Sequence, residues 1–202
     1  MSDRSAGGNR GPHRPAPRGG SPRAGGPRPK PGGGAKRKGG IWLVRLNASE
    51  FALSHPKCIQ EMEPDYEEGI ELRREGDFEA ARDALRYALQ GCGDNIWVHV
   101  ALGQIALEDF NDPGLARGHF GYGFELAEKA IPRDFSGRIP REHPANRPLY
   151  DAIDGLIACH EKLGQPALAA ELRGLAARWL GGGRPAPGPG SSGPADGLPS
   201  RP

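Results

Sequence analysis

The sequence is poor in cysteine, methionine and aromatic residues. Of its 202 residues only 3 are Cys and 2 are Met, and aromatic side chains make up 6%. Cysteines that are few, odd in number and widely spaced predict no disulfide framework and fit a reducing compartment. No apolar run approaches the roughly 18 residues that suggest a membrane span, and the N-terminus lacks the apolar core of a secretion signal. We therefore expect a cytoplasmic protein that does not enter a membrane.

Aromatic residues are absent altogether from both ends of the chain. Residues 1–40 contain 12 Gly and 7 Pro, residues 181–202 contain 7 Gly and 6 Pro, and neither segment has a Phe, Tyr or Trp. Such segments bury too little apolar surface to offset the entropy cost of folding. We expect both to be disordered, and the folded domain to span residues 41–180.

The small net charge of +2 hides two segments of opposite sign. Residues 1–40, named the basic arm here, carry 10 Lys and Arg against one acidic residue, whereas residues 41–180 carry 15 against 23. A flexible polycation binds phosphates by releasing counterions. Lys36, Arg37 and Lys38 are therefore candidate contacts to RNA or DNA, although an arm without aromatic residues cannot stack on bases. The alternative is a tail that only keeps the protein soluble.

The most informative stretch is residues 66–89, whose spacing predicts two helices joined by a tight turn. Gly76 suits the left-handed residue that ends a helix, and Asp77 suits the N-cap of the next one. Apolar side chains recur at helical spacing on one face of the second helix. Small residues on both helices let the backbones approach closely; these are Gly69, Ala81 and Ala88.

These turn and small-residue positions resemble those of the tetratricopeptide repeat (TPR). Gly103 lies 34 residues after Gly69, which is the period of that repeat. Ala116 corresponds to Ala81, with one residue inserted in the turn between the helices. Residues 148–180 resemble the repeat more weakly and form either a third hairpin or a terminal cap. The resemblance implies an all-α fold, a short TPR-like array of about three antiparallel helical hairpins.

The resemblance also implies where a partner binds. In such arrays the first helix of each hairpin lines a concave surface that holds peptides. The corresponding residues of this chain are Tyr66, Arg73, Arg74, Gln104 and Glu108. Members that hold chaperone C-termini carry Lys and Asn at several such positions, and this chain does not, so we do not expect that version of the function. Arg73 and Arg74 are expected either to pair with an acidic ligand or, as helix-surface arginines more often are, to be solvated or in exposed ion pairs that contribute little.

Residues 131–148 interrupt the helical pattern with four prolines and four arginines. The prolines exclude a continuous helix, and a long loop without secondary structure inside a domain is often functional. One interpretation is a binding loop whose Arg141 and Arg147 contact the partner. The favoured interpretation is a loop that packs over the helices, with Phe135 and Ile139 as anchors.

The pattern leaves the structure of residues 41–46 open but predicts a buried helix over residues 96–109. The apolar run at residues 41–46 is either a short strand or an extended segment laid against the helices, because it is too short for periodicity to decide. His55 and Pro56 then break any helix that begins near residue 51. Residues 96–109 form a predicted helix that is apolar on nearly all sides, which indicates burial at the centre of the domain.

Residues that carry catalysis or bind metals form no recognisable motif. The glycines at residues 114–123 lack the preceding strand and the Gly-Lys-Ser/Thr ending of a phosphate loop. His55, Cys58, Cys92 and His99 are zinc-ligand types, but their spacing matches no zinc pattern, so a zinc-stapled helical domain is a weaker alternative. We expect no enzyme, cofactor or metal. The sequence favours a protein–protein interaction scaffold, with nucleic-acid association through the basic arm as the alternative.

Overall fold

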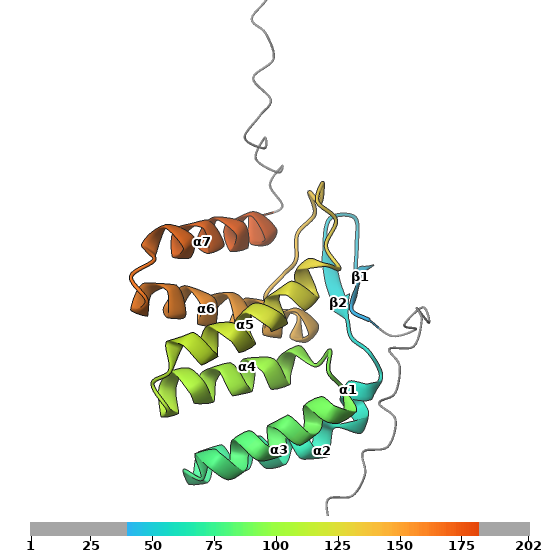
Figure 1. The fold of residues 1–202 in the computed structure, drawn as a ribbon. Helices are drawn as coiled ribbons and strands as arrows, with labels where there is room; N and C mark the ends of the chain where they lie inside the picture. The colour runs from blue at the N-terminus through green and yellow to red at the C-terminus, as the bar shows by residue number, and fades with distance from the viewer. Residues whose placement is uncertain (1–39, 182–202) are drawn as a thin grey trace, which may run out of the picture. The chain divides into compact units, whose positions relative to one another are not determined.

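The computed structural model describes residues 40–181 (Figure 1). The predictions for the basic arm, including Lys36, Arg37 and Lys38, and for the C-terminal tail from residue 182 onward lie outside these residues. Helices predominate in the described part of the chain, which confirms the prediction of a mainly helical domain. Within that part, none of the helices has both the length and the apolar character needed to cross a membrane.

Two short strands come first and helices follow. The strands are β1 (Trp42–Arg45) and β2 (Phe51–Ser54). The helices are α1 (Cys58–Glu61), α2 (Glu63–Glu75), α3 (Phe78–Gly91), α4 (Ile96–Gln104), α5 (Pro113–Glu128), α6 (Arg147–Lys162) and α7 (Pro166–Gly181). A π-helical turn, η1 (Ile105–Asp109), extends α4, and a 3₁₀ turn, η2 (Pro144–Asn146), precedes α6.

Consecutive helices pack in pairs: α2 against α3, α4 against α5, and α6 against α7 (Figure 1). Each connecting turn contains a residue with positive φ, namely Gly76 at 87°, Asn111 at 49° and Gly164 at 69°. Asp77 and Asp112 cap the helices that follow two of these turns. Each carboxylate accepts a hydrogen bond from the backbone N–H three residues later, at 3.1 and 2.9 Å. The turn predicted at Gly76 and Asp77 is therefore confirmed.

Two glycines allow the paired helices to approach closely. A Cβ atom added at Gly69 in α2 would lie 2.6 Å from the Leu85 side chain of α3. At Gly103 in α4 it would lie 2.8 Å from the Phe120 ring of α5. Leu85 and Phe120 are fully buried, so neither has free space into which it can move.

Helix α4 lies at the centre of the domain, as its apolar sequence predicts. Val98 and Leu102 pack with buried residues of α3. Ile96 and Val100 belong to a larger cluster that also contains side chains of α5, α6 and α7. Because α4 has side chains in both clusters, it joins them into one core. Each Val, Leu or Ile side chain that is fully buried there contributes about 1.5–3 kcal/mol.

The expectation of an all-α fold omitted a small sheet. Strands β1 and β2 are antiparallel, with Trp42 opposite Ser54 and Arg45 opposite Phe51. The turn between the strands is held by Asn47, whose Oδ1 accepts two backbone N–H bonds at 3.0 Å. Each strand is only four residues long, and the pairing satisfies backbone groups that neither segment could satisfy alone.

The loop at residues 131–148 packs against both the sheet and α7. Ile139 is fully buried, and its N–H donates to the Trp179 carbonyl at 2.7 Å. The buried Asn146 side chain accepts from the Leu53 N–H at 2.8 Å and donates to two backbone carbonyls at 3.1 and 2.9 Å. These contacts favour the packing interpretation of the loop over the binding interpretation.

Candidate partner-binding surface

Three of the predicted binding residues converge at the C-terminal end of α2. The Arg73 guanidinium donates to Asp109 and Glu108, each at 2.7 Å, and to Gln104 Oε1 at 3.2 Å. These partners lie on α4 and η1, so the cluster fastens the first hairpin to the second. Two carboxylates already pair with Arg73. The structure therefore does not leave Arg73 free for the acidic ligand that the sequence suggested.

The arginines of the loop and of α6 lie elsewhere on the domain. Arg141 Nη2 donates to Asp154 at 2.6 Å and to Asp151 at 3.4 Å, and the guanidinium lies 5.6 Å from the Tyr150 ring centroid. Arg147 begins α6, is exposed, and makes no ion pair with another described residue. These two arginines therefore do not join the cluster around Arg73.

Tyr66 and Arg74 both lie on α2, where Tyr66 is half-buried and Arg74 is exposed. Both line a shallow depression along that helix, and Arg74 pairs there with Glu71 at 2.8 Å. Burial raises the pKa of the Tyr66 phenol, and the nearby Asp151 carboxylate of α6 raises it further. Tyr66 thus stays neutral at physiological pH.

Tyr66 also lines a second, more enclosed site, which we name the crevice. The crevice has a volume of about 320 Å³ and separates α1 and the start of α2 from the start of α4. Its lining residues are Ile59, Gln60, Glu63, Tyr66, Asn95 and Trp97. Tyr66 and Trp97 are both partly exposed, so two aromatic side chains are accessible from one opening.

Local structure fixes the position of Trp97. Asn95 caps α4 by accepting the Val98 N–H at 3.3 Å, which places Trp97 in the first turn of the helix. The His55 ring lies 4.2 Å from the Trp97 ring, centroid to centroid. His55 Nε2 in turn donates to the Ala145 carbonyl at 2.7 Å. Burial lowers the pKa of His55, so a neutral imidazole supports the indole at pH 7.

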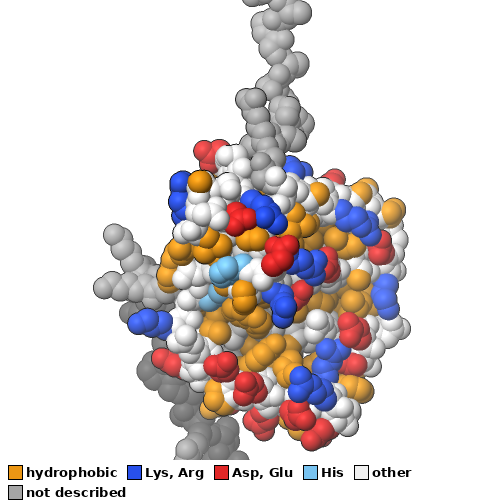
Figure 2. Space-filling view, turned by 180° about the vertical axis from the view of Figure 1, so that it is seen from behind, with side chains coloured by type: hydrophobic (Ala, Val, Ile, Leu, Met, Phe, Trp, Pro, Cys, Tyr) orange, Lys and Arg blue, Asp and Glu red, His pale blue; other side chains and the backbone are white. Residues whose placement is uncertain are grey.

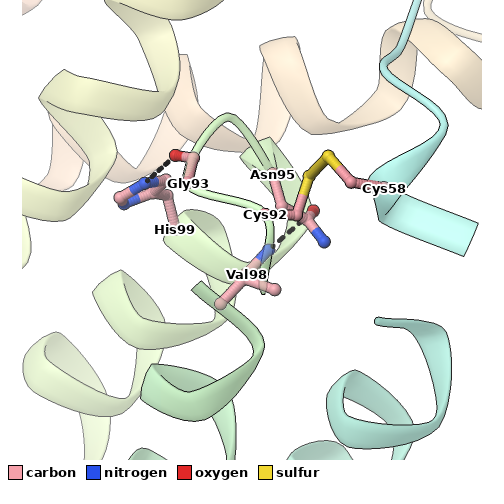
Figure 3. The surroundings of a disulfide bond; sticks show 6 residues. All are labelled: Cys58, Cys92, Gly93, Asn95, Val98 and His99. Carbon is pink, nitrogen blue, oxygen red and sulfur yellow. Dashed lines mark hydrogen bonds between the residues drawn. A yellow bond between two sulfur atoms is a disulfide. The ribbon is translucent and has the colours of Figure 1, made fainter. Parts of the chain in front are cut away.

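A disulfide braces the walls of the crevice. Cys58, at the start of α1, is bonded to Cys92, which follows α3, with 5.4 Å between their Cα atoms (Figure 3). The expectation that the cysteines form no disulfide is therefore wrong for this pair, and the inference of a reducing compartment loses its support. It is wrong because folding brings together residues 34 positions apart.

The disulfide also bears on the zinc alternative. Two sulfurs that are bonded to each other cannot serve as zinc thiolates. The third cysteine, Cys159, is free and buried.

Carboxylates without cationic partners surround the crevice. Glu63 lines it, and Glu67 and Glu68 line the adjacent depression on α2. None of the three pairs with a Lys or Arg among the described residues. Figure 2 shows acidic side chains gathered along the lower edge of the domain, at the end where α2 and α3 lie in Figure 1. These carboxylates outnumber Lys57, the exposed cation directly before α1, so the surface near the crevice has a net negative charge.

Sequence reasoning missed most of the crevice. The apolar pattern of residues 96–109 predicts that Trp97 is in the core, and the sequence marks His55 only as a helix breaker and a zinc-ligand type. Glu63 did not stand out among the six acidic residues of α2. One feature of the sequence could have indicated it. Trp97 lies 34 residues after Glu63, the same period that relates Gly103 to Gly69, so the two residues occupy equivalent positions in successive predicted repeats.

Comparisons with family models, with curated proteins and with solved structures found no match to this chain.

Proposed function

We propose that this protein is a non-enzymatic interaction scaffold with a TPR-like arrangement of three hairpins. The hairpins would be α2–α3, α4–α5 and α6–α7, and the surface lined by α2, α4 and α6 would hold a protein or peptide. The sequential packing of the pairs supports this proposal, together with the left-handed residue in each turn and the close contacts at Gly69 and Gly103. One fold can carry many unrelated functions, so the proposal depends on the chemistry of the surface itself.

The single observation that carries the proposal is the crevice between the first and second hairpins. Tyrosine and tryptophan that stay partly accessible in a concave site are the side chains that most often dominate binding energy. The Trp97 ring is already fixed by His55, and the wall next to it is fixed by the disulfide. A ligand therefore pays little entropy to order this part of the surface.

A peptide-display selection on the full chain tests the proposal. Peptides recovered on the wild-type chain should lose at least about tenfold in affinity for the Trp97→Ala and Tyr66→Ala variants, because each substitution removes an anchor worth more than 1 kcal/mol. The matched control is Tyr87→Ala, which removes an exposed tyrosine of α3. Peptides that bind all four chains equally, or no recovered peptide at all, would contradict the proposal.

The charge separation along the sequence supports a second candidate function, sequence-independent nucleic-acid binding through the basic arm. Neutralising Lys36, Arg37 and Lys38 to Gln in the full chain should lower the salt concentration at which heparin releases it, because fewer counterions are displaced. The control replaces Arg82, Arg86 and Arg117 of the helical domain with Gln. An unchanged elution position in the arm variant would remove this candidate.

A further inference from the structure

The crevice has a chemical character that the proposed function does not specify. Ile59, Tyr66 and Trp97 give it mainly apolar walls. Among the described residues that line it, Glu63 is the only one with an ionisable acid or base at neutral pH. A ligand group that fits here needs an apolar body together with a charge or dipole that a carboxylate attracts.

The charges near the crevice are not balanced within the protein. Of the cations on α2, Arg74 pairs with Glu71, and Arg73 pairs with two carboxylates at the far end of the helix. Lys57, which precedes α1, is exposed and has no ion pair with another described residue. Glu63, Glu67 and Glu68 also lack a cationic partner among the described residues, and they outnumber Lys57. The charge that remains for a ligand to neutralise is negative.

The aromatic walls favour the same kind of ligand. A Lys ammonium or Arg guanidinium over the face of Trp or Tyr is attracted by the ring quadrupole, and Trp gives the strongest attraction. The stem of either side chain is apolar and packs along aliphatic surface while its charged end stays near water. Ile59 offers such a surface at the crevice wall. An acidic side chain would gain nothing from the rings and would be repelled by Glu63.

From these observations we infer that the crevice receives a Lys or Arg side chain from a basic segment of the partner protein. The inference rests on the proposed function, because it names the chemistry of the ligand held on that surface. The cationic end lies over the Tyr66 and Trp97 rings, Glu63 supplies the counter-charge at the rim, and Glu67 supplies a second one a turn further along α2. No covalent step is involved.

The test uses the full chain and a positional-scanning library of acetylated, amidated nonapeptides that carry every natural side chain at each position. We expect binding to require Lys or Arg at one position at least. Replacing that residue with norleucine or citrulline, which keep the stem and remove the charge, should raise the Kd roughly tenfold. The titration is repeated with Lys36, Arg37 and Lys38 changed to Gln, so that the protein's own basic arm does not compete.

A charge variant of the protein links this preference to the crevice. Glu63→Gln combined with Glu67→Gln should weaken binding of the best peptide roughly tenfold at low ionic strength and much less at high salt. The matched control is Glu128→Gln combined with Glu171→Gln, which removes two exposed carboxylates from α5 and α7 and should leave the Kd unchanged. Equal weakening by both pairs would mean diffuse attraction and would overturn the inference.

Failure of this inference can be told from failure of the proposed function. Peptides that depend on Trp97 but prefer acidic or uncharged residues would overturn the inference and leave the scaffold proposal intact. Absence of any peptide that depends on Trp97 would overturn both. A dependence on Lys or Arg that Trp97→Ala does not alter would place the cation elsewhere on the surface, which also overturns the inference.

Discussion

The two ends of α2 face the α4–η1 segment in opposite ways. At the C-terminal end, Arg73 donates to Asp109, Glu108 and Gln104, so its charge is already paired inside the protein. At the N-terminal end, Tyr66 and Trp97 line an open crevice and the neighbouring carboxylates lack partners. Holding two helices together needs only contacts of the first kind. The second kind leaves side chains accessible, as the proposed binding of a partner requires.

We call the N-terminal end of α2, beside the crevice, the open end, and the C-terminal end, at Arg73, the closed end. The largest effect is expected from breaking the disulfide that braces the open end. In the chain-entropy model, a bond that closes a loop of 34 residues stabilises the fold by about 3 to 4 kcal/mol. Cys92→Ser should lower the free energy of unfolding by about that amount, as measured by urea denaturation, and should also weaken peptide binding because α1 forms one wall of the crevice. The wild-type chain under reducing conditions should match the variant. Equal stability with and without reductant would contradict this prediction.

A smaller effect is expected at the closed end. Arg73→Ala removes hydrogen bonds to two carboxylates and leaves Asp109, whose side chain is 16% exposed, without its partner. We expect a loss of about 2 kcal/mol in the free energy of unfolding, with the affinity of crevice-binding peptides nearly unchanged. The control, Arg74→Ala, breaks a well-exposed pair and should cost less than about 1 kcal/mol.

If Arg73→Ala abolished peptide binding and left stability unchanged, the assignments of the two ends would be reversed. The titration of crevice-binding peptides and the urea denaturation of the same Arg73→Ala sample decide between these outcomes, so each end of α2 is judged by both affinity and stability.

The features predicted correctly from the sequence are those that neighbouring residues determine. Gly76 and Asp77 specify a turn by their own conformational and hydrogen-bonding properties, and the apolar run over residues 96–109 specifies a buried helix. The predicted binding residues Arg73, Gln104 and Glu108 do lie together. Their spacing could not reveal that they bind one another, because that depends on how far apart α2 and α4 pack.

The features missed depend on contacts between distant segments. Cys58 and Cys92 meet because α1 folds back to the end of α3, and the odd number of cysteines reflects a third, buried one, Cys159. Trp97 is apolar like its neighbours in α4, and only the position of α1 and Tyr66 leaves it partly accessible. Asn146 gave no sequence signal, although its side chain ties the loop to β2.

The open end should also respond to pH. Burial lowers the pKa of His55 from its ordinary 6.5, so the unfolded chain binds this proton more readily than the folded one. The titration of His55 therefore leaves the free energy of unfolding unchanged above about pH 7 and lowers it as the pH drops below about 6.5. Protonated His55 beside Trp97 also repels a cationic ligand. Urea denaturation and peptide titration at pH 7.5 and 5.0 measure both effects.

A substitution of His55 and a substitution at the closed end separate the cause of this pH dependence. His55→Gln keeps a group that can donate to the Ala145 carbonyl but removes the titration, so its loss of stability at pH 5.0 should be smaller than that of the wild type. Arg73→Ala, at the closed end, should retain the wild-type difference between the two pH values. The prediction fails if the His55→Gln chain loses as much stability on acidification as the wild-type chain.

The smallest expected effect on stability gives the sharpest contrast between the two ends. Glu63 lies in the first turn of α2, where a negative charge interacts favourably with the helix dipole. Because Glu63 is exposed and has no ion pair with another described residue, Glu63→Gln should cost no more than about 0.3 to 1 kcal/mol in urea denaturation. Its effect on the affinity for a basic peptide should be larger than this cost, which is the reverse of Arg73→Ala. A Glu63→Gln chain that loses stability but keeps its affinity would mean that Glu63 serves the helix alone, and that both ends of α2 are structural.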